Sequence, residues 1–387
     1  MASALRQKIE EEIRKGGPIP FSRYMELCLY DPELGYYSRH AGQFGKAGDF
    51  YTSSDVHAVF GRLLARQFEQ AWRALGGPPQ MELLELGPGR GLFAQDVLDW
   101  AEKKFPNFFA AVHYSLVESS PALRAHLQET LSRHFSSGKC SLVDPLESVA
   151  FRPGGMQRAL PADIPLVVFA NEFFDALPVE VLSRKGSLRI DVRDGRFCET
   201  WAPASAAELE YLDRFAVHPE PGERVEAPLL AQEYMTQVAR LIRRGFLIVV
   251  DYGYTRDEVL SGRHRGTIMA YRQHSASPNA YEAPGEQDIT AHVNFTALAS
   301  AAEQNGMDVH RLLTQSQFLM GIGESTQFSD AFEDCRLPQE RAKVALQLKH
   351  LVTPAGLGET FHVMIASKQV GAAEAKNLSG LRFGVTI

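Results

Sequence analysis

Short apolar runs alternate with amphipathic stretches through the central part of the chain. The apolar runs have the length of buried strands and lie at residues 82–86, 112–117, 141–143, 166–170 and 246–250. Stretches with apolar residues at helical spacing separate several of them, at residues 91–104, 121–134 and 228–243. This alternation predicts an α/β fold with an open, mainly parallel, Rossmann-like sheet and helices on both faces.

The segment before this pattern predicts an N-terminal addition over residues 1–80. Leu5, Ile9 and Ile13 mark one face of a first helix, a loop-rich stretch follows, and a second helix is expected at about 55–74. A Gly-Gly-Pro-Pro break then precedes the first strand of the sheet. The addition is therefore expected to combine helices with a loop.

Residues 81–387 are expected to form the main domain, with an insertion at about 179–245. Residues 179–201 predict a β-hairpin that turns at Asp194-Gly195, and the helix at 228–243 completes the insertion. The tail predicts helices at 294–305 and 337–350 and an apolar strand at 361–366.

Composition excludes several classes of protein. The 387 residues carry a net charge of −7, with a pI of about 6.0, which argues against a general affinity for nucleic acid. The four cysteines lie far apart with no Cys-x-x-Cys pair, and the twelve histidines form no ligand-like cluster, so no metal is expected.

Targeting signals are the next feature to consider. No apolar run approaches the roughly 20 residues that cross a bilayer. Residues 1–17 contain three consecutive glutamates, which suits neither a signal peptide nor a transit peptide. These observations lead to the expectation of a cytoplasmic protein without a membrane span.

A glycine-rich turn follows the first strand and opens a helix. Its glycines, Gly87, Gly89 and Gly91, alternate with other residues, and Glu85 precedes them by two positions. A dinucleotide-binding turn favours glycine or alanine where this chain has Leu92. An acid followed by glycines suits S-adenosylmethionine, whose positive charge a carboxylate favours directly or through water. The alternative is a plain tight turn.

Acids also follow the second and third strands. Glu118 ends the second strand, where a carboxylate accepts hydrogen bonds from ribose hydroxyls, although an acid before Pro121 also suits a helix N-terminus. Asp144 ends the third strand and is a candidate for binding the adenine amino group. Asp144-Pro145 is equally good turn chemistry.

The fourth strand ends in Asn-Glu-Phe-Phe-Asp-Ala-Leu-Pro at residues 171–178. A guanidinium acceptor is protonated and lacks a lone pair for attack, so carboxylates that grip its other nitrogens are needed. Glu172 and Asp175 are candidates for this catalytic role, with Asn171 orienting the acceptor. The alternative is a polar loop without a site.

Two further segments are weaker candidates. Residues 48–53 form a lid-like loop in which Asp49 and Tyr51 are candidates for donor binding; Ser54 or Asp55 after it suits a helix cap. Tyr51 and the phenylalanines at 173 and 174 are candidates for facing a sulfonium or guanidinium, although aromatic side chains more often belong to a core. Residues 251–254 end the fifth strand and would line the same cleft.

With these segments assembled, the chain resembles the MidA family of class I S-adenosylmethionine-dependent methyltransferases, which includes a mitochondrial complex I assembly-factor arginine methyltransferase. The segments that carry the resemblance occur in the family's order and cover most of the chain: residues 48–53, 85–91, 170–178, 251–253, 266–272 and 288–296. The run at 171–178 is the most specific of them.

The resemblance implies a seven-stranded methyltransferase sheet, S-adenosylmethionine as donor, and a protein arginine as acceptor, with symmetric dimethylation as one outcome. It also raises a respiratory-complex subunit as a partner. Ser54-Asp55 stands where relatives often have Pro-Glu, and Asn294 where aspartate is usual, so the acceptor here can differ.

Two other functions are compatible with the same sequence. One is a small-molecule methyltransferase whose pocket the additions form, and the other is an assembly protein that binds S-adenosylmethionine without turnover. Intact acids at 172 and 175 beside an intact glycine turn favour chemistry over a relic site. Fold and motif alone do not name the acceptor.

Overall fold

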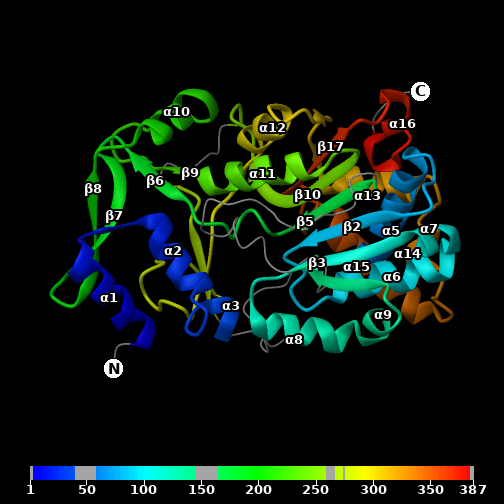
Figure 1. Ribbon diagram of the computed structural model, residues 1–387, viewed down its shortest axis with the longest axis horizontal. Helices are drawn as coiled ribbons and strands as arrows, with labels where there is room; N and C mark the ends of the chain where they lie inside the picture. The colour runs from blue at the N-terminus through cyan, green and yellow to red at the C-terminus, as the bar shows by residue number, and fades with distance from the viewer. Residues whose placement is uncertain (1–2, 40–57, 144–163, 259–265, 273–274, 384–387) are drawn as a thin grey trace.

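The computed structural model describes residues 3–39, 58–143, 164–258, 266–272 and 275–383 (Figure 1). Its centre is a sheet with the strand order β15-β17-β10-β5-β2-β3-β4, in which β14 also pairs with β10 and β16 with β17. The strands of this sheet are β2 (Met81–Leu86), β3 (Val112–Val117), β4 (Cys140–Val143), β5 (Leu166–Asn171), β10 (Gly245–Tyr254), β14 (Val293–Asn294), β15 (Asp308–Val309), β16 (Leu313–Thr314) and β17 (Phe361–Lys368).

The predicted parallel α/β sheet is confirmed. Strands β4, β3, β2, β5 and β10 are parallel to one another, and β17 runs antiparallel between β10 and the short strands β15 and β16. Strand β10 continues to Tyr254, beyond the apolar run that ends at Val250, because its last part also pairs with β14.

Helices cover both faces of this sheet (Figure 1). On one face α5 (Ala58–Ala74), α6 (Leu92–Lys104) and α13 (Gln315–Glu324) enclose a core in which Phe93 stacks on Phe169 of β5 at a centroid distance of 4.6 Å. On the other face α11 (Leu229–Leu241) and α12 (Phe295–Glu303) bury a second core. Burial on both faces explains why the strands are continuous apolar runs.

A second body forms from segments at the start and in the middle of the chain. Strand β1 (Ile19–Pro20) pairs with β7 (Gly186–Arg193), which pairs with β8 (Arg196–Ala202) and β6 (Glu180–Ser183); β6 also pairs with β9 (Val225–Ala227). Helices α1 (Ala4–Gly16) and α2 (Phe21–Tyr30) pack on this sheet in one apolar cluster. The N-terminal helices and the insertion therefore share a core.

The turn at Asp194-Gly195 lies where the sequence predicts it, with φ angles of 50° and 68°. The insertion contains more structure than the single hairpin expected, because β6 and β9 extend it and α10 (Ala206–Phe215) follows it. Helix α2 was also missed, because its polar side is narrow: only Ser22, Arg23 and Glu26 interrupt the buried residues between Phe21 and Leu29.

The remaining elements complete the described chain. They are α3 (Tyr36–Arg39), α7 (Pro106–Ala111), α8 (Pro121–Thr130), α9 (Ser132–Ser136), β11 (Met269–Arg272), β12 (Ser275–Ser277), β13 (Asp288–Thr290), α14 (Ser329–Phe332), α15 (Pro338–Val352), α16 (Ala372–Ala375) and the short helix η1 (Ser379–Leu381). In Figure 1 the carboxyl ends of the parallel strands point to the side where α2 and α3 lie. The second body therefore stands over one edge of the central sheet.

Asn294 belongs to a corner that joins α10 to α12. Its Oδ1 accepts the N–H of Ala297 and caps α12, while its Nδ2 donates to the Tyr211 hydroxyl at 2.8 Å and to the Phe215 carbonyl at 2.9 Å. An aspartate caps a helix equally well but cannot donate to a carbonyl. The asparagine at this position thus serves a buried contact within the fold.

We expect Asn294→Asp to lower the free energy of unfolding by about 1–3 kcal/mol, because it leaves the buried Phe215 carbonyl without a donor. Urea unfolding would measure this effect. The matched control is Asn377→Asp, where the exposed side chain is only an acceptor, from Arg382. Equal stability of the two variants would contradict this account of Asn294.

Candidate active site

Four parallel strands end side by side at one edge of the central sheet. Strand β2 lies between β3 and β5, so the chain builds one side of the sheet with β3 and β4 and then crosses to the other side for β5 and β10. In an open parallel sheet, ligands bind outside the carboxyl ends of the strands where the order reverses. The segments that follow β2, β3, β5 and β10 therefore define the candidate site.

The turn after β2 is built on three glycines with positive φ, 64° at Gly87, 53° at Gly89 and 79° at Gly91. A Cβ at Gly87 would lie 2.9 Å from Phe173, and one at Gly91 would lie 2.7 Å from Leu127. At Gly89 a Cβ would meet no atom of the described residues within 4 Å. The turn is thus packed tightly at both ends and faces open space at its middle glycine.

The carboxylate of Glu118, directly after β3, lies next to this turn. The Ser120 N–H donates to Glu118 Oε1 at 2.9 Å, and the N–H groups of Ser119 and Gly89 also favour the ionised form. Burial outweighs them and raises the pKa of Glu118 to about 7. A carboxylate retains lone pairs for further donors, and a role of Glu118 in binding ribose stays a prediction.

Glu85 is buried at the end of β2. The Tyr114 hydroxyl of the neighbouring strand donates to its Oε2 at 2.9 Å, and burial raises the pKa of Glu85 to about 8. Its side chain is thus engaged with β3. A role of Glu85 in binding the donor stays a prediction.

One carboxylate holds the loop after β5. Oδ2 of Asp251, in β10, accepts the N–H groups of three consecutive residues, Phe173 at 3.2 Å, Phe174 at 2.9 Å and Asp175 at 3.3 Å. Its Oδ1 accepts the N–H of Tyr252 at 3.0 Å. Asp251 is fully buried, so these bonds replace its hydration.

The loop begins with a strained residue. Glu172 has a φ of 49°, a conformation that costs a residue with a side chain about 1 kcal/mol or more and that is often found at functional sites. The preceding side chain supports it, because Nδ2 of Asn171 donates to Glu172 Oε1 at 3.1 Å. The bonds to Asp251 offset this strain.

The structure brings the predicted catalytic residues together. Glu172, Asp175 and Asp251 act on one another: burial, then Asp175 and Glu172, raise the pKa of Asp251 well above its usual value. Burial also raises the pKa of Asp175 to about 6, a rise that the Tyr252 hydroxyl opposes. Asn171 precedes Glu172 as the last residue of β5. The loop therefore concentrates carboxyl groups beside the glycine turn.

Aromatic side chains join the loop to the glycine turn. The Phe173 ring packs against Gly87 and lies 4.9 Å from the Tyr234 ring of α11, while Phe174 is 5.3 Å from Phe173. Burial and, after it, the Glu118 charge raise the pKa of Tyr234. Tyr234 is thus part of the same surroundings, although its sequence signal is only that of a helix face that packs on the core.

Two tyrosines of the N-terminal addition also reach this site and were not predicted. The Tyr30 hydroxyl donates to the Ala176 carbonyl at 3.0 Å, and the Tyr37 hydroxyl donates to Asp288 Oδ1 at 2.9 Å. Nothing in the local sequence marks them, because their partners lie far away along the chain.

The described residues do not include every candidate. Asp49, Tyr51 and Asp144 lie outside them, as do Ser54 and Asp55. Their expected parts in donor binding stay predictions. In the described part of the chain, no group of three or more His, Cys, Asp and Glu side chains is arranged to hold a metal ion.

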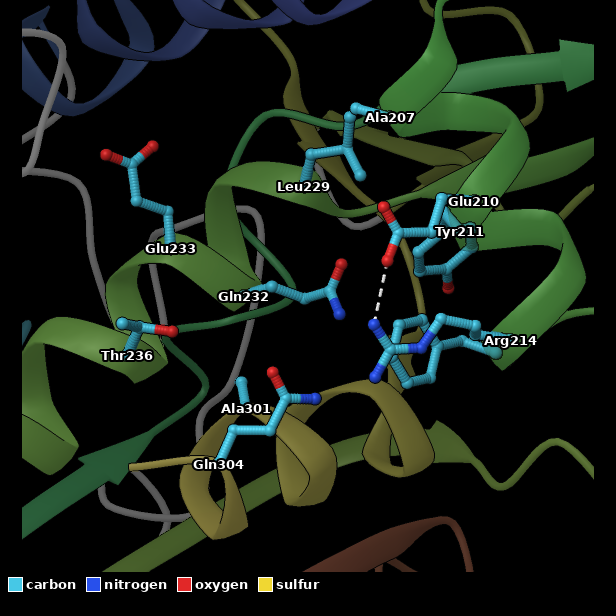
Figure 2. Close-up of a pocket in the computed structure, with 11 residues that line it drawn as sticks. Ala207, Glu210, Tyr211, Arg214, Leu229, Gln232, Glu233, Thr236, Ala301 and Gln304 are labelled. Carbon is cyan, nitrogen blue, oxygen red and sulfur yellow. Dashed lines mark hydrogen bonds and ion pairs between the residues drawn. The ribbon is translucent and has the colours of Figure 1, made fainter. Parts of the chain in front are cut away.

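A shallow groove of about 220 Å³ lies apart from these strand ends (Figure 2). It runs between α10, α11 and α12, and the ion pair between Glu210 and Arg214, 2.8 Å long, forms part of its wall. Helix α11 presents Gln232 and Thr236 to this groove, whereas its Tyr234 packs on Phe173. The groove and the candidate active site are therefore on different sides of α11.

The residues at the strand ends fit S-adenosylmethionine. The open space at Gly89 and the Glu118 carboxylate are suited to an adenosine, and Oδ1 of Asn171 is buried without a hydrogen-bond partner in the described chain. The parallel sheet, its antiparallel strand β17 and this site define a class I methyltransferase. The chain belongs to a family of S-adenosyl-L-methionine-dependent methyltransferases, whose profile matches residues 63–313, more than half of its length.

Relatives support this assignment and the MidA resemblance. The chain is 28% identical to the protein arginine methyltransferase NDUFAF7 homolog, mitochondrial, of Drosophila melanogaster, over 96% of this chain and 86% of the relative. It is 27% identical to human NDUFAF7, a mitochondrial protein arginine methyltransferase, over 91% of this chain and 80% of that protein. A Burkholderia thailandensis crystal structure with bound S-adenosyl-homocysteine is similar at a TM-score of 0.79 and 28% identity, covering 95% of this chain and 93% of that one. S-adenosylmethionine is thus the cofactor.

The expectation of a cytoplasmic protein is wrong in the light of the animal relatives, which are named as mitochondrial. It depended on the lack of a leader-like pattern in residues 1–17, and such a lack does not identify a compartment. Among the described residues, no helix combines the length and the apolar character that spanning a membrane requires.

We expect Gly89→Val to weaken binding of S-adenosylhomocysteine by at least about tenfold, because the side chain fills the open space at the turn. Calorimetric titration would measure this change. Gly91→Val is the comparison: its side chain meets Leu127, so it should mainly lower stability. Unchanged binding by a folded Gly89→Val protein would contradict the assignment.

We expect Asp251→Ala to lower the free energy of unfolding by about 3 kcal/mol or more, since it leaves buried N–H groups of the loop without an acceptor. Asp251→Asn keeps one acceptor oxygen, so its free energy of unfolding should fall by less. Urea unfolding of both variants would measure the difference. An alanine variant as stable as wild type would show that the loop does not depend on this carboxylate.

Proposed function

We propose that this protein transfers a methyl group from S-adenosylmethionine to the guanidinium of an arginine in a protein substrate. The observation that carries the proposal is the cluster of carboxyl groups beside the glycine turn, in which Asp175 and Asp251 are buried and Glu172 is half-buried. The names of the relatives, protein arginine methyltransferases, support the same acceptor. Dimethylation and a respiratory-complex subunit as substrate stay predictions.

The donor would be held by the turn at Gly87, Gly89 and Gly91 and by Glu118. The turn leaves room for the donor at Gly89, and the carboxylate oxygens of Glu118 accept hydrogen bonds from ribose hydroxyls. When bound, S-adenosylmethionine supplies a methyl group activated by the positive sulfur. The protein's part is to align the attacking nitrogen with that methyl group and to exclude water.

The acceptor needs carboxylates for a chemical reason. A protonated guanidinium has no lone pair on any nitrogen, so its charge must be localised away from the attacking nitrogen. Glu172 and Asp175 are proposed to bind the other two nitrogens, and Asn171 to orient the group. The strained backbone at Glu172 aims its side chain from a rigid loop, which limits the orientations that the acceptor samples.

Electrostatics favour a cation at this place. No ion pair with a lysine, arginine or histidine engages Asp175 or Asp251 among the described residues. Because burial raises the pKa of Asp175 to about 6, the carboxylate is costly without a counter-charge. An arginine side chain would supply that charge, and a neutral acceptor would not.

We expect Glu172→Gln to slow methyl transfer by about 100-fold or more, while binding of S-adenosylhomocysteine changes by less than about twofold. Labelled methyl transfer to arginine-containing proteins, followed by hydrolysis and amino-acid analysis, would measure the rate and identify the acceptor. Glu210→Gln, in the groove on the far side of α11, is the matched control.

Two results would overturn the proposal. Label recovered only in a small molecule would exclude a protein arginine as the acceptor. Full activity of Glu172→Gln would remove the assigned role of that carboxylate, even if arginine were methylated.

A further inference from the structure

Tyr37 lies at the meeting point of the donor side and the acceptor side. Its carbonyl accepts a hydrogen bond from Ser120 Oγ at 3.0 Å, and the N–H of the same serine donates to Glu118 Oε1. Its hydroxyl donates to Asp288 Oδ1 at 2.9 Å. One residue of α3 thus contacts both the strand end that carries Glu118 and the strand β13 that carries Asp288.

Strand β13 is joined in turn to the loop after β5. The N–H of Ala291, the residue after β13, donates to the Asp175 carbonyl at 2.9 Å. The Tyr30 ring lies 5.4 Å from the Tyr37 ring, and its hydroxyl donates to the Ala176 carbonyl. Asp288 is therefore held against the catalytic loop by backbone contacts and by two tyrosines.

The carboxyl groups of Asp288 and Asp175 act on the same two hydroxyls. Burial and then Asp288 raise the pKa of both Tyr30 and Tyr37, and Asp175 contributes in each case. Asp175 is 5% exposed, and its Oδ1 accepts no hydrogen bond from the described residues. A buried acceptor oxygen without a donor calls for an explanation, and the N–H groups of a ligand would supply one.

We propose that Asp288, oriented by Tyr37, is a specificity-determining residue that binds the cationic acceptor beside the catalytic loop. This rests on the proposed function, since it assumes a guanidinium as acceptor. A guanidinium has five N–H donors in one plane, more than Glu172 and Asp175 satisfy from one side. The N-terminal addition thereby forms part of the acceptor site and connects it to the donor-binding acid through Ser120.

Titration of the full-length protein, saturated with S-adenosylhomocysteine, with Nα-acetyl-arginine amide tests this directly. We expect wild type to bind the probe and to reject its neutral citrulline analogue. Asp288→Asn should bind the arginine probe at least about tenfold more weakly, and Tyr37→Phe about threefold more weakly, with unchanged affinity for S-adenosylhomocysteine. In the transfer assay, KM for an arginine peptide should rise in both variants while kcat changes little.

Tyr24→Phe is the matched control. It removes a buried hydroxyl of the same N-terminal body, one that donates to the Ala280 carbonyl at 2.9 Å. It should lower stability without changing probe affinity. Thermal unfolding of each variant separates a loss of folded protein from a loss of binding.

The possible results separate a failure of the Asp288 assignment from a failure of the proposed function. If Asp288→Asn binds the arginine probe as wild type does, the assignment of Asp288 is wrong and the proposed function is untouched. If the variants lower kcat, or affinity for S-adenosylhomocysteine, and leave KM unchanged, Asp288 supports the fold rather than the acceptor. If wild type binds S-adenosylhomocysteine but neither binds the arginine probe nor methylates arginine, the proposed function fails together with this inference.

Discussion

The candidate site depends on the hydrogen bonds between one buried carboxylate and three consecutive N–H groups. Asp251 lies in the strand next to β5, and it holds the loop that carries Glu172 and Asp175 in a backbone conformation that is unfavourable by itself. Because these N–H groups donate to the buried side chain of Asp251, the loop keeps its conformation without a bound substrate. The same arrangement puts Phe173 against Gly87, so the glycine turn and the loop after β5 are positioned as one unit.

Much of the central sheet was predictable from the sequence, because its strands are buried on both faces and appear as apolar runs of the right length. The glycine turn and the acids at 118, 172 and 175 follow those runs directly, so their position at one sheet edge follows from the parallel order of the strands. The dominant role of Asp251 was not predictable. The sequence shows an acid at the end of a predicted strand, but not that the N–H groups of a distant loop point at it.

The second body was the harder part, for a physical reason. Strand β1 has two residues, and its pairing with β7 joins Ile19 to Ile190. The contact between Tyr37 and Asp288 spans 251 positions. Periodicity along the chain encodes which residues are buried, but not which of two distant buried segments meet. The tyrosines of α2 and α3 therefore carried no local sign of their place.

The discontinuous make-up of the second body also bears on how the protein is synthesised. Helices α1, α2 and α3 leave the ribosome early, yet the hydrogen-bond partners of their Arg6, Tyr24 and Tyr37 side chains follow 189, 256 and 251 residues later. Contacts of such high sequence separation form slowly, and domains fold during synthesis at the pace of chain elongation. We therefore expect the apolar faces of the nascent N-terminal helices to stay exposed until their partners are synthesised. Early binding by a chaperone would then protect them. Methyl-transfer competence would then arise only after most of the chain has emerged.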